Sequence, residues 1–202
     1  MVRPRSPEAH EKVLRAAIEL FADRGIEATS MDSIARLSGV SKATIYNHWA
    51  DKEALLLEVM VFVNGLDREP DDVDTGDLCR DLATVLNRRP PIEHEPFRDR
   101  MMPSLIAYSA THPEFGKAWR HRVMEPPRQA LKRILCRAIE HGQLPPSLDL
   151  DLAMALLLGP MLYRHIFVRP SIPPESGSDL GTPVAETFCR AYASTAHPNE
   201  AR

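Results

Sequence analysis

Apolar residues recur three and four positions apart along most of this chain, the spacing that places them on one face of an α-helix. The first such stripe consists of Val13, Ala16, Ala17, Leu20 and Phe21. Pro7 suits the first turn of that helix, and Gly25 suits its end. No run alternates between apolar and polar residues for long enough to predict a strand. The pattern therefore predicts an all-α protein with about nine helices.

Residues 29–52 contain two short apolar stripes joined by a tight turn. Ser30 is suited to cap the first helix, because its hydroxyl can accept a hydrogen bond from an unpaired backbone N–H. The inward side of that helix is formed by Ile34, Ala35 and Leu37. Gly39 can adopt the positive φ that ends a helix. We therefore expect a helix, a turn and a second helix here.

The second helix of this stretch is predicted to run from residue 42 to residue 49, with Ser41 as its cap. Ile45 and Trp49 lie four positions apart and anchor the helix inward. The outward residues near its N-terminal end are Lys42, Ala43, Thr44 and Asn47. Such a helix, following a tight turn, can enter the major groove of DNA. The stretch is therefore predicted to be a helix-turn-helix.

Asp51 is suited to cap a longer helix, and the acidic stretch 67–77 is predicted to be a loop. We place a domain boundary near that loop. The predicted organisation is a DNA-binding domain over 1–50, a linking helix over about 51–66 and a second helical domain over 67–202.

Beyond the boundary, helices are predicted to begin near Leu78, Phe97, Pro113, Asp149 and Thr182. Pro126 and Pro127 are predicted to break or restart the helix that begins near Pro113, because proline lacks the N–H that a helix interior needs.

The N-terminal part of the chain, with its predicted helix-turn-helix, resembles the TetR (tetracycline repressor) family of one-component bacterial regulators. The resemblance covers residues 8–60 and is carried by Ile34, Ala35, Gly39, Val40, Ser41, Thr44, Ile45, Tyr46, His48, Trp49, Lys52 and Leu55. Phenylalanine is commoner than tryptophan at position 49 in that family, and either supplies an aromatic plug. The resemblance implies a helical ligand-binding and dimerisation domain after the helix-turn-helix.

The exposed side of the helix-turn-helix and the resemblance together predict a set of DNA-binding residues. The set is Ser30, Arg36, Ser41, Lys42, Ala43, Thr44, Tyr46, Asn47, His48 and Lys52. Donors near the start of the second helix can reach base edges or phosphates, whereas Tyr46 and His48 suit phosphate oxygens. The resemblance implies a phosphate contact for Lys52.

The distribution of charge supports a local DNA-binding surface. The 202-residue chain has a net charge of −3, which argues against a protein that coats DNA without regard to sequence. Residues 33–50 nevertheless contain no acidic residue. Because affinity for DNA depends on neutralising phosphates, such a stretch suits the predicted contact surface.

Other classes of protein find little support in the sequence. The three cysteines, Cys79, Cys136 and Cys189, are far apart and odd in number, so neither a disulfide framework nor a metal site is expected. The expected compartment is the reducing cytoplasm. The histidines show no metal-ligand spacing, and no cofactor motif or catalytic constellation is found. We therefore expect no enzymatic activity, no cofactor and no bound metal. The longest apolar run, 152–162, is too short for a membrane span.

Apolar and sulfur-containing side chains of the second domain are candidates to line a ligand cavity, with plain core packing as the alternative for each. The candidates are Met102, Ile106, Phe115, Trp119 and Met161. The last two helices are apolar enough to predict a symmetric dimer contact, with burial inside one chain as the alternative.

The predicted function is that of a sequence-specific DNA-binding transcriptional regulator. We expect a homodimeric repressor that a small-molecule effector releases from a palindromic operator. The alternative is a DNA-binding regulator without a small-molecule ligand, controlled by a protein partner. An enzyme that has kept a helical scaffold is a further alternative, and turnover of a bound ligand would reveal it.

Overall fold

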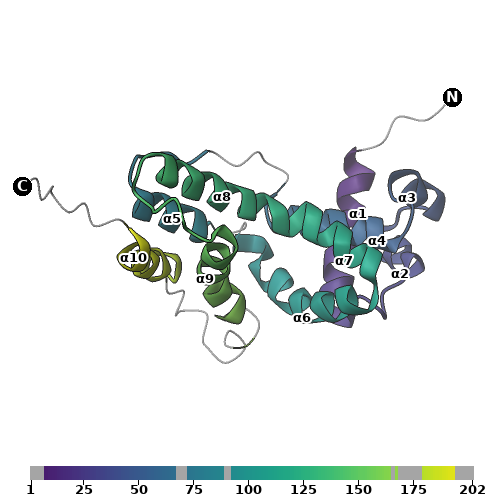
Figure 1. The fold of residues 1–202 in the computed structure, drawn as a ribbon. Helices are drawn as coiled ribbons and strands as arrows, with labels where there is room; N and C mark the ends of the chain where they lie inside the picture. The colour runs from purple at the N-terminus through teal and green to yellow at the C-terminus, as the bar shows by residue number, and fades with distance from the viewer. Residues whose placement is uncertain (1–6, 67–71, 89–91, 165–166, 168–178, 194–202) are drawn as a thin grey trace, which may run out of the picture. The chain divides into compact units, whose positions relative to one another are not determined.

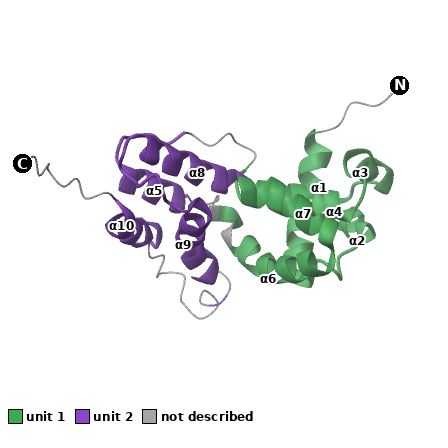
Figure 2. Ribbon diagram, viewed as in Figure 1, with its two compact units in different colours: residues 1–69, 89–125 green, residues 70–88, 126–202 purple. Residues whose placement is uncertain are grey.

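The computed structural model describes residues 7–66, 72–88, 92–164, 167 and 179–193, and every regular element within them is helical (Figure 1). Two compact units divide the chain (Figure 2). Unit 1 contains Met1–Glu69 and Arg89–Glu125, and unit 2 contains Pro70–Arg88 and Pro126–Arg202. The predicted all-α class is confirmed. Part of the loop predicted at 67–77 lies outside the described residues.

Four N-terminal helices form the first part of unit 1: α1 (Pro7–Arg24), α2 (Met31–Ser38), α3 (Lys42–His48) and α4 (Lys52–Val63). The predicted apolar stripe of α1 is buried, and α1 packs against each of the other three. Gly25 follows α1 with a φ of 80°, a conformation that side chains with a Cβ rarely adopt. The first helix thus forms the support on which the helix-turn-helix rests.

The chain returns to unit 1 after residue 91. A short turn, η1 (Ile92–His94), leads into α6 (Glu95–Thr111), which packs on α1 and α4. Helix α7 (Pro113–Trp119) and the π-helical turn η2 (Arg120–Met124) also contact α4. Buried side chains from both parts of unit 1 form one apolar core. The predicted division into functional domains stays a prediction, because a shared core does not assign a function.

The helices of unit 2 are α5 (Leu78–Leu86), α8 (Glu125–Glu140) from Pro126 onward, α9 (Leu150–Tyr163) and α10 (Gly181–Tyr192). Helices α5 and α10 pack against each other, and α9 packs against α10. The core of unit 2 includes Leu82 from α5, Leu135 from α8, Leu157 from α9 and Phe188 from α10.

Helical structure continues without a gap from Pro113 to Glu140, because α7, η2 and α8 follow one another directly. The ten α-helices of the described residues therefore form nine helical segments, as predicted. Pro126 and Pro127 lie in the first turn of α8, where a missing N–H is tolerated. Just before them, the backbone N–H of Glu125 donates to the carbonyl of Arg120 and closes the wider π-helical turn η2. The prolines thus mark a restart, not a break.

None of the helices in the described part of the chain has the length and apolar character that a membrane span requires.

Candidate nucleic-acid interface

Short polar side chains set the ends of α2 and α3. The Ser30 hydroxyl accepts a hydrogen bond from the Ser33 backbone N–H at 3.2 Å, and the Ser33 hydroxyl accepts one from the Ser30 N–H at 3.1 Å. Gly39 ends α2 with a φ of 68°. Ser41 then caps α3 by accepting from the Thr44 N–H at 3.2 Å. These local bonds fix the turn between the two helices.

Helix α3 has one buried side and one exposed side. Ile45 and Trp49 are 1% and 2% exposed and anchor the helix in the core of unit 1. The predicted DNA-binding residues on the other side are exposed at Ser41, Lys42, Ala43, Tyr46 and Asn47, and half-buried at Thr44 and His48. A polar surface on a short helix after a tight turn matches the geometry that reads the major groove. The predicted contacts themselves stay predictions.

Two predicted contact residues lie on or beside α2. Ser30 and Arg36 are both exposed. The prediction that Leu37 points inward was wrong, because this side chain is 47% exposed. It lies beyond the edge of the buried stripe, which follows the spacing of Met31 and Ile34.

Trp49, the aromatic residue at the end of α3, is held by a carboxylate that was not predicted from the sequence. The Trp49 Nε1–H donates to Oε2 of Glu58 at 2.5 Å, and Oε1 of the same carboxylate lies 2.5 Å from Nε2 of His10. The imidazole of His10 also stacks on the Trp49 indole, with ring centroids 4.9 Å apart. Glu58 thus joins α1, α3 and α4 at a single point.

An acidic residue from α2 lies beside the start of α3, the predicted recognition helix. The Lys42 ammonium lies 2.6 Å from Oδ1 of Asp32, and both side chains are more than half exposed. Residues 33–50 contain no acid in sequence, but the fold brings Asp32 into the same surface. The charge of Lys42 is therefore partly compensated before any DNA arrives.

Lys52, predicted to meet a phosphate, is already bound within the protein. Its Nζ donates to the backbone carbonyl of Ile26 at 2.9 Å and lies 5.8 Å from the ring centroid of Tyr108. The phosphate contact stays a prediction, and it would have to compete with these two internal contacts.

Helix α6 holds the N-terminal helices through two polar contacts. Nη1 of Arg100 lies 2.7 Å from Oδ1 of Asp23 in α1, and the Tyr108 hydroxyl donates to Oε1 of Glu53 in α4 at 2.9 Å. Burial, followed by the Glu53 carboxylate, raises the pKa of Tyr108 above its ordinary value. No pattern within the chain could have found these contacts, because their partners are more than fifty residues apart.

The predicted ligand-lining residues are divided between the two units. Phe115 and Trp119 are buried in the core of unit 1, where Met102 and Ile106 pack against it half-buried. Met161 is half-buried in α9 of unit 2. Their assignment to a ligand site stays a prediction.

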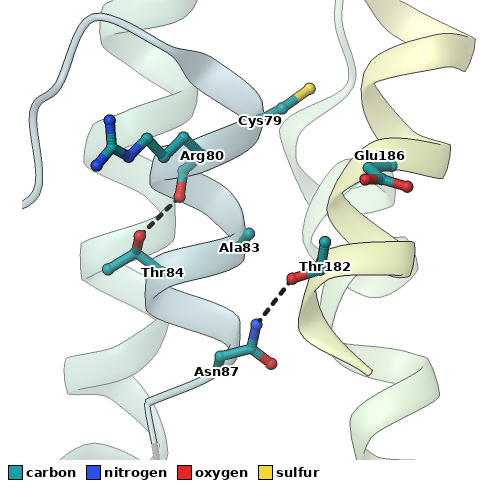
Figure 3. A pocket seen from close by; sticks show the side chains of 7 residues that line it. All are labelled: Cys79, Arg80, Ala83, Thr84, Asn87, Thr182 and Glu186. Carbon is teal, nitrogen blue, oxygen red and sulfur yellow. Dashed lines mark hydrogen bonds between the residues drawn. The ribbon is translucent and has the colours of Figure 1, made fainter. Parts of the chain in front are cut away.

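A pocket of about 360 Å³ lies between α5 and α10 (Figure 3). Its lining residues are Cys79, Arg80, Ala83, Thr84, Asn87, Thr182 and Glu186. Asn87 closes one end, because its Nδ2 donates to the Thr182 hydroxyl at 3.2 Å and its Oδ1 accepts from the Gly181 N–H at 3.0 Å. None of the predicted ligand residues lines this pocket.

The expectation of unpaired cysteines was wrong for two of the three. Cys79 and Cys189 form a disulfide between α5 and α10, and Cys136 is free. Their 110-residue separation in sequence hid the pair, because helix packing brings their Cα atoms to 6.1 Å. Among the described residues, no group of three or more acidic, histidine or cysteine side chains is arranged to hold a metal ion.

An exposed polar helix that follows a tight turn and rests on α1 is the arrangement found in helix-turn-helix DNA-binding proteins. A family model described as bacterial regulatory proteins of the tetR family matches residues 13–59, and one described as a tetracyclin repressor-like C-terminal domain matches residues 72–195. The chain belongs to the TetR family, whose members are DNA-binding transcription factors and not enzymes.

Individual relatives agree with this assignment. The uncharacterised HTH-type regulator YdeS of Bacillus subtilis is 30% identical over 180 residues, which cover 88% of each chain. The solved structure of the TetR-family regulator SCO0332 is 27% identical, with a TM-score of 0.58 over 91% of this chain and 97% of that one. The flavonoid-responsive regulator FrrA has the same fold at 23% identity, with a TM-score of 0.66 over 95% of this chain and 100% of that one.

Proposed function

We propose that this protein is a homodimeric repressor that binds a palindromic operator in the cytoplasm and leaves it when a small molecule binds. The observation that carries the proposal is the division of α3 into a buried side, Ile45 and Trp49, and an exposed side that includes Lys42, Tyr46 and Asn47. A dimer presents two such helices to successive major grooves about one helical turn apart.

The exposed side of α9 supports the dimer. Leu152, Leu156 and Leu162 are 50%, 43% and 47% exposed, and Tyr163 follows at 62%. These positions recur at helical spacing on the side of α9 that faces away from the core residues Ala153 and Leu157. An apolar stripe of this kind marks a protein contact, and a second copy of the chain offers the same stripe in return.

A buried donor supports the small-molecule effector. Trp119 is 8% exposed, and its Nε1–H has no hydrogen-bond partner among the described residues. A buried N–H without an acceptor is unfavourable, so a ligand that brings an acceptor to Trp119 gains the bond that the protein lacks. FrrA, which shares the fold, is described as flavonoid-responsive, and flavonoids combine aromatic rings with carbonyl and hydroxyl oxygens.

The first experiment is selection of bound sequences from random duplex DNA with the purified full chain at physiological salt. We expect a palindrome whose half-sites lie about one helical turn apart. Binding of Lys42→Ala and Tyr46→Ala to the selected site should be weaker, and the slope of log affinity against log salt should fall by about 1 for each lost phosphate contact.

Lys117→Ala is the matched control, because it removes another exposed positive charge from α7, outside the helix-turn-helix. Equal losses in Lys117→Ala and Lys42→Ala would mean that general charge, and not α3, determines binding. Recovery of no motif would overturn the proposal that α3 reads a specific sequence.

The effector is tested by thermal unfolding with a set of flavonoids, because a ligand that binds only the folded state raises the melting temperature. We expect a rise that is smaller in Trp119→Phe, which keeps an aromatic ring and loses the N–H. If neither these compounds nor a broader set of aromatic carbonyl compounds stabilises the chain, control by a protein partner becomes the better account.

A further inference from the structure

We propose that Cys79 and Cys189 form a reversible thiol–disulfide site that responds to hydroperoxides. The two cysteines belong to neighbouring helices of unit 2, and their Cα atoms lie 6.1 Å apart, within the range that a disulfide spans. The third cysteine, Cys136 on α8, is half-buried and takes no part in the pair. The site therefore consists of two defined thiols and leaves one as an internal reference.

The two cysteines differ in how far they are exposed to solvent. Cys79 lines the pocket between α5 and α10 and is half-buried, whereas Cys189 is 6% exposed (Figure 3). Cys79 also lies in the first turn of α5, at the partially positive end of the helix. The pair thus combines an accessible cysteine with a buried one, the arrangement expected when one thiol reacts and the other resolves.

The place where the protein acts argues that the disulfide is transient. If the protein binds chromosomal DNA, as the proposed function requires, it works in a compartment whose reductants keep thiols reduced. Disulfides formed there in mesophilic proteins are usually catalytic or redox-sensing. On this ground the oxidised pair represents a response to an oxidant.

The chemistry balances with a hydroperoxide as oxidant and a dithiol as reductant. The Cys79 thiolate attacks one peroxide oxygen, the O–O bond breaks, and the other oxygen leaves as water or an alcohol after taking a proton. The sulfur of Cys189 then attacks the sulfenic acid at Cys79, the S–S bond forms, and water leaves with the Cys189 proton. A dithiol later reverses the step by thiol–disulfide exchange and becomes a disulfide itself.

The state of the pair determines how α10 is attached. The N-terminal end of α10 is held by the hydrogen bonds of Asn87 to Thr182 and Gly181. The disulfide adds a covalent attachment two turns further along, at Cys189. Oxidation therefore fixes α10 to α5 at both ends, and reduction leaves the second half of α10 to packing alone. Because α10 packs against α9, whose exposed stripe is the proposed dimer surface, we expect oxidation to strengthen the dimer and operator binding.

The test uses the full chain and counts thiols directly. The protein is reduced with dithiothreitol, freed of reductant, treated with hydrogen peroxide, denatured, and labelled with a maleimide for mass spectrometry. We expect three labelled cysteines before peroxide and one, Cys136, afterwards, with three again after fresh dithiothreitol. Cys79→Ser and Cys189→Ser should each prevent intramolecular pairing, whereas Cys136→Ser should pair normally and leave no label after peroxide.

Three results would overturn the proposal: three labels after peroxide, pairing that includes Cys136 or a second chain, or a disulfide that dithiothreitol does not open in the folded protein. These readouts need no operator, so they are independent of the proposed DNA function. The operator step is then measured on the oxidised and reduced forms with the selected DNA. In the wild type and in Cys136→Ser only, we expect the oxidised form to bind the operator severalfold more tightly than the reduced form. Equal affinities of the two forms would show that the thiol pair does not affect DNA binding.

Discussion

The ammonium of Lys42, at the first position of α3, lies 2.6 Å from the carboxylate of Asp32 in the first turn of α2. The two helices of the helix-turn-helix are therefore joined by charge on the side that is proposed to meet DNA. Because the pair is exposed, its contribution to stability is small. Its effect on binding is larger in principle, since Asp32 both occupies Lys42 and repels phosphate.

We predict that Asp32→Asn tightens operator binding by about twofold to fivefold, equivalent to at most roughly 1 kcal/mol. The change removes a negative charge near the phosphates and frees Lys42 to contact one. Affinity is measured by fluorescence anisotropy at two salt concentrations. Asp74→Asn serves as control, because Asp74 is an exposed acid in unit 2 that lies 3.8 Å from Arg137. Weaker binding by Asp32→Asn would show instead that the pair orients Lys42 for contact.

The hydrogen bond from Tyr108 to Glu53 provides a second prediction. Tyr108→Phe is expected to lower the free energy of unfolding by about 1 kcal/mol, because the Glu53 carboxylate loses a donor in a partly buried place. Urea unfolding at neutral pH measures this loss. An unchanged stability would mean that water replaces the hydroxyl without cost.

The same tyrosine predicts a dependence on alkaline pH. Because folding raises the pKa of Tyr108, the folded state keeps this proton at pH values where the unfolded chain releases it. The contribution to stability is complete below the unfolded value of about 10 and is lost as pH rises above it. The free energy of unfolding should therefore fall more steeply above about pH 10 in the wild type than in Tyr108→Phe. Tyr46→Phe, at a half-exposed tyrosine, should follow the wild type.

Glu58 is predicted to matter more than an ordinary surface acid. Glu58→Ala should lower the free energy of unfolding by about 1–3 kcal/mol, because the buried indole N–H of Trp49 loses its acceptor and His10 loses a partner. Glu11→Ala removes the exposed pair with Arg15 on α1 and should cost less than about 0.5 kcal/mol. Equal costs in urea unfolding would show that the contact with Trp49 adds nothing.

Gly159 offers a test of the proposed dimer surface. It lies inside α9 and is exposed, and a Cβ added there meets no atom within 4 Å. Within one chain, Gly159→Ala should therefore stabilise α9 by about 0.5–1 kcal/mol through helix propensity. If a partner helix packs on Gly159, the same methyl group should weaken the dimer by about 1–3 kcal/mol.

Sedimentation over a range of concentrations separates these two effects. Leu156→Glu, which places a charge in the exposed stripe of α9, should yield monomers. Leu37→Glu makes the same change at an equally exposed leucine on α2 and should leave the dimer intact. A dimer that tolerates Leu156→Glu would move the interface away from α9.

The parts of the site that local chemistry determines could be predicted from the sequence. Ser30, Gly39 and Ser41 act on backbone groups within a few residues of themselves, so their roles follow from residue type and spacing. The two sides of α3 likewise follow from the helical period, which places Ile45 and Trp49 together. The error at Leu37 shows the limit of this reasoning, because the width of a buried stripe depends on what covers it.

Contacts between distant residues could not be predicted in this way. Asp32 is ten residues from Lys42, Glu58 is 48 residues from His10, and Cys79 is 110 residues from Cys189. Each pair consists of common residue types whose meeting depends on how helices pack. A single sequence carries no signal for such meetings, and charge counted along the chain missed the acid that lies beside the recognition helix.

Unit 1 is discontinuous, since its core is completed by residues 89–125 after the chain has passed through α5. The ribosome therefore releases the helix-turn-helix and its neighbours α1 and α4 before it releases α6 and α7, which pack against them. Until α6 and α7 emerge, the apolar sides of α1 and α4 that they cover remain open to water or to chaperones. Under the proposed function, a chain could therefore bind its operator as a finished regulator only after residues 89–125 have joined the core.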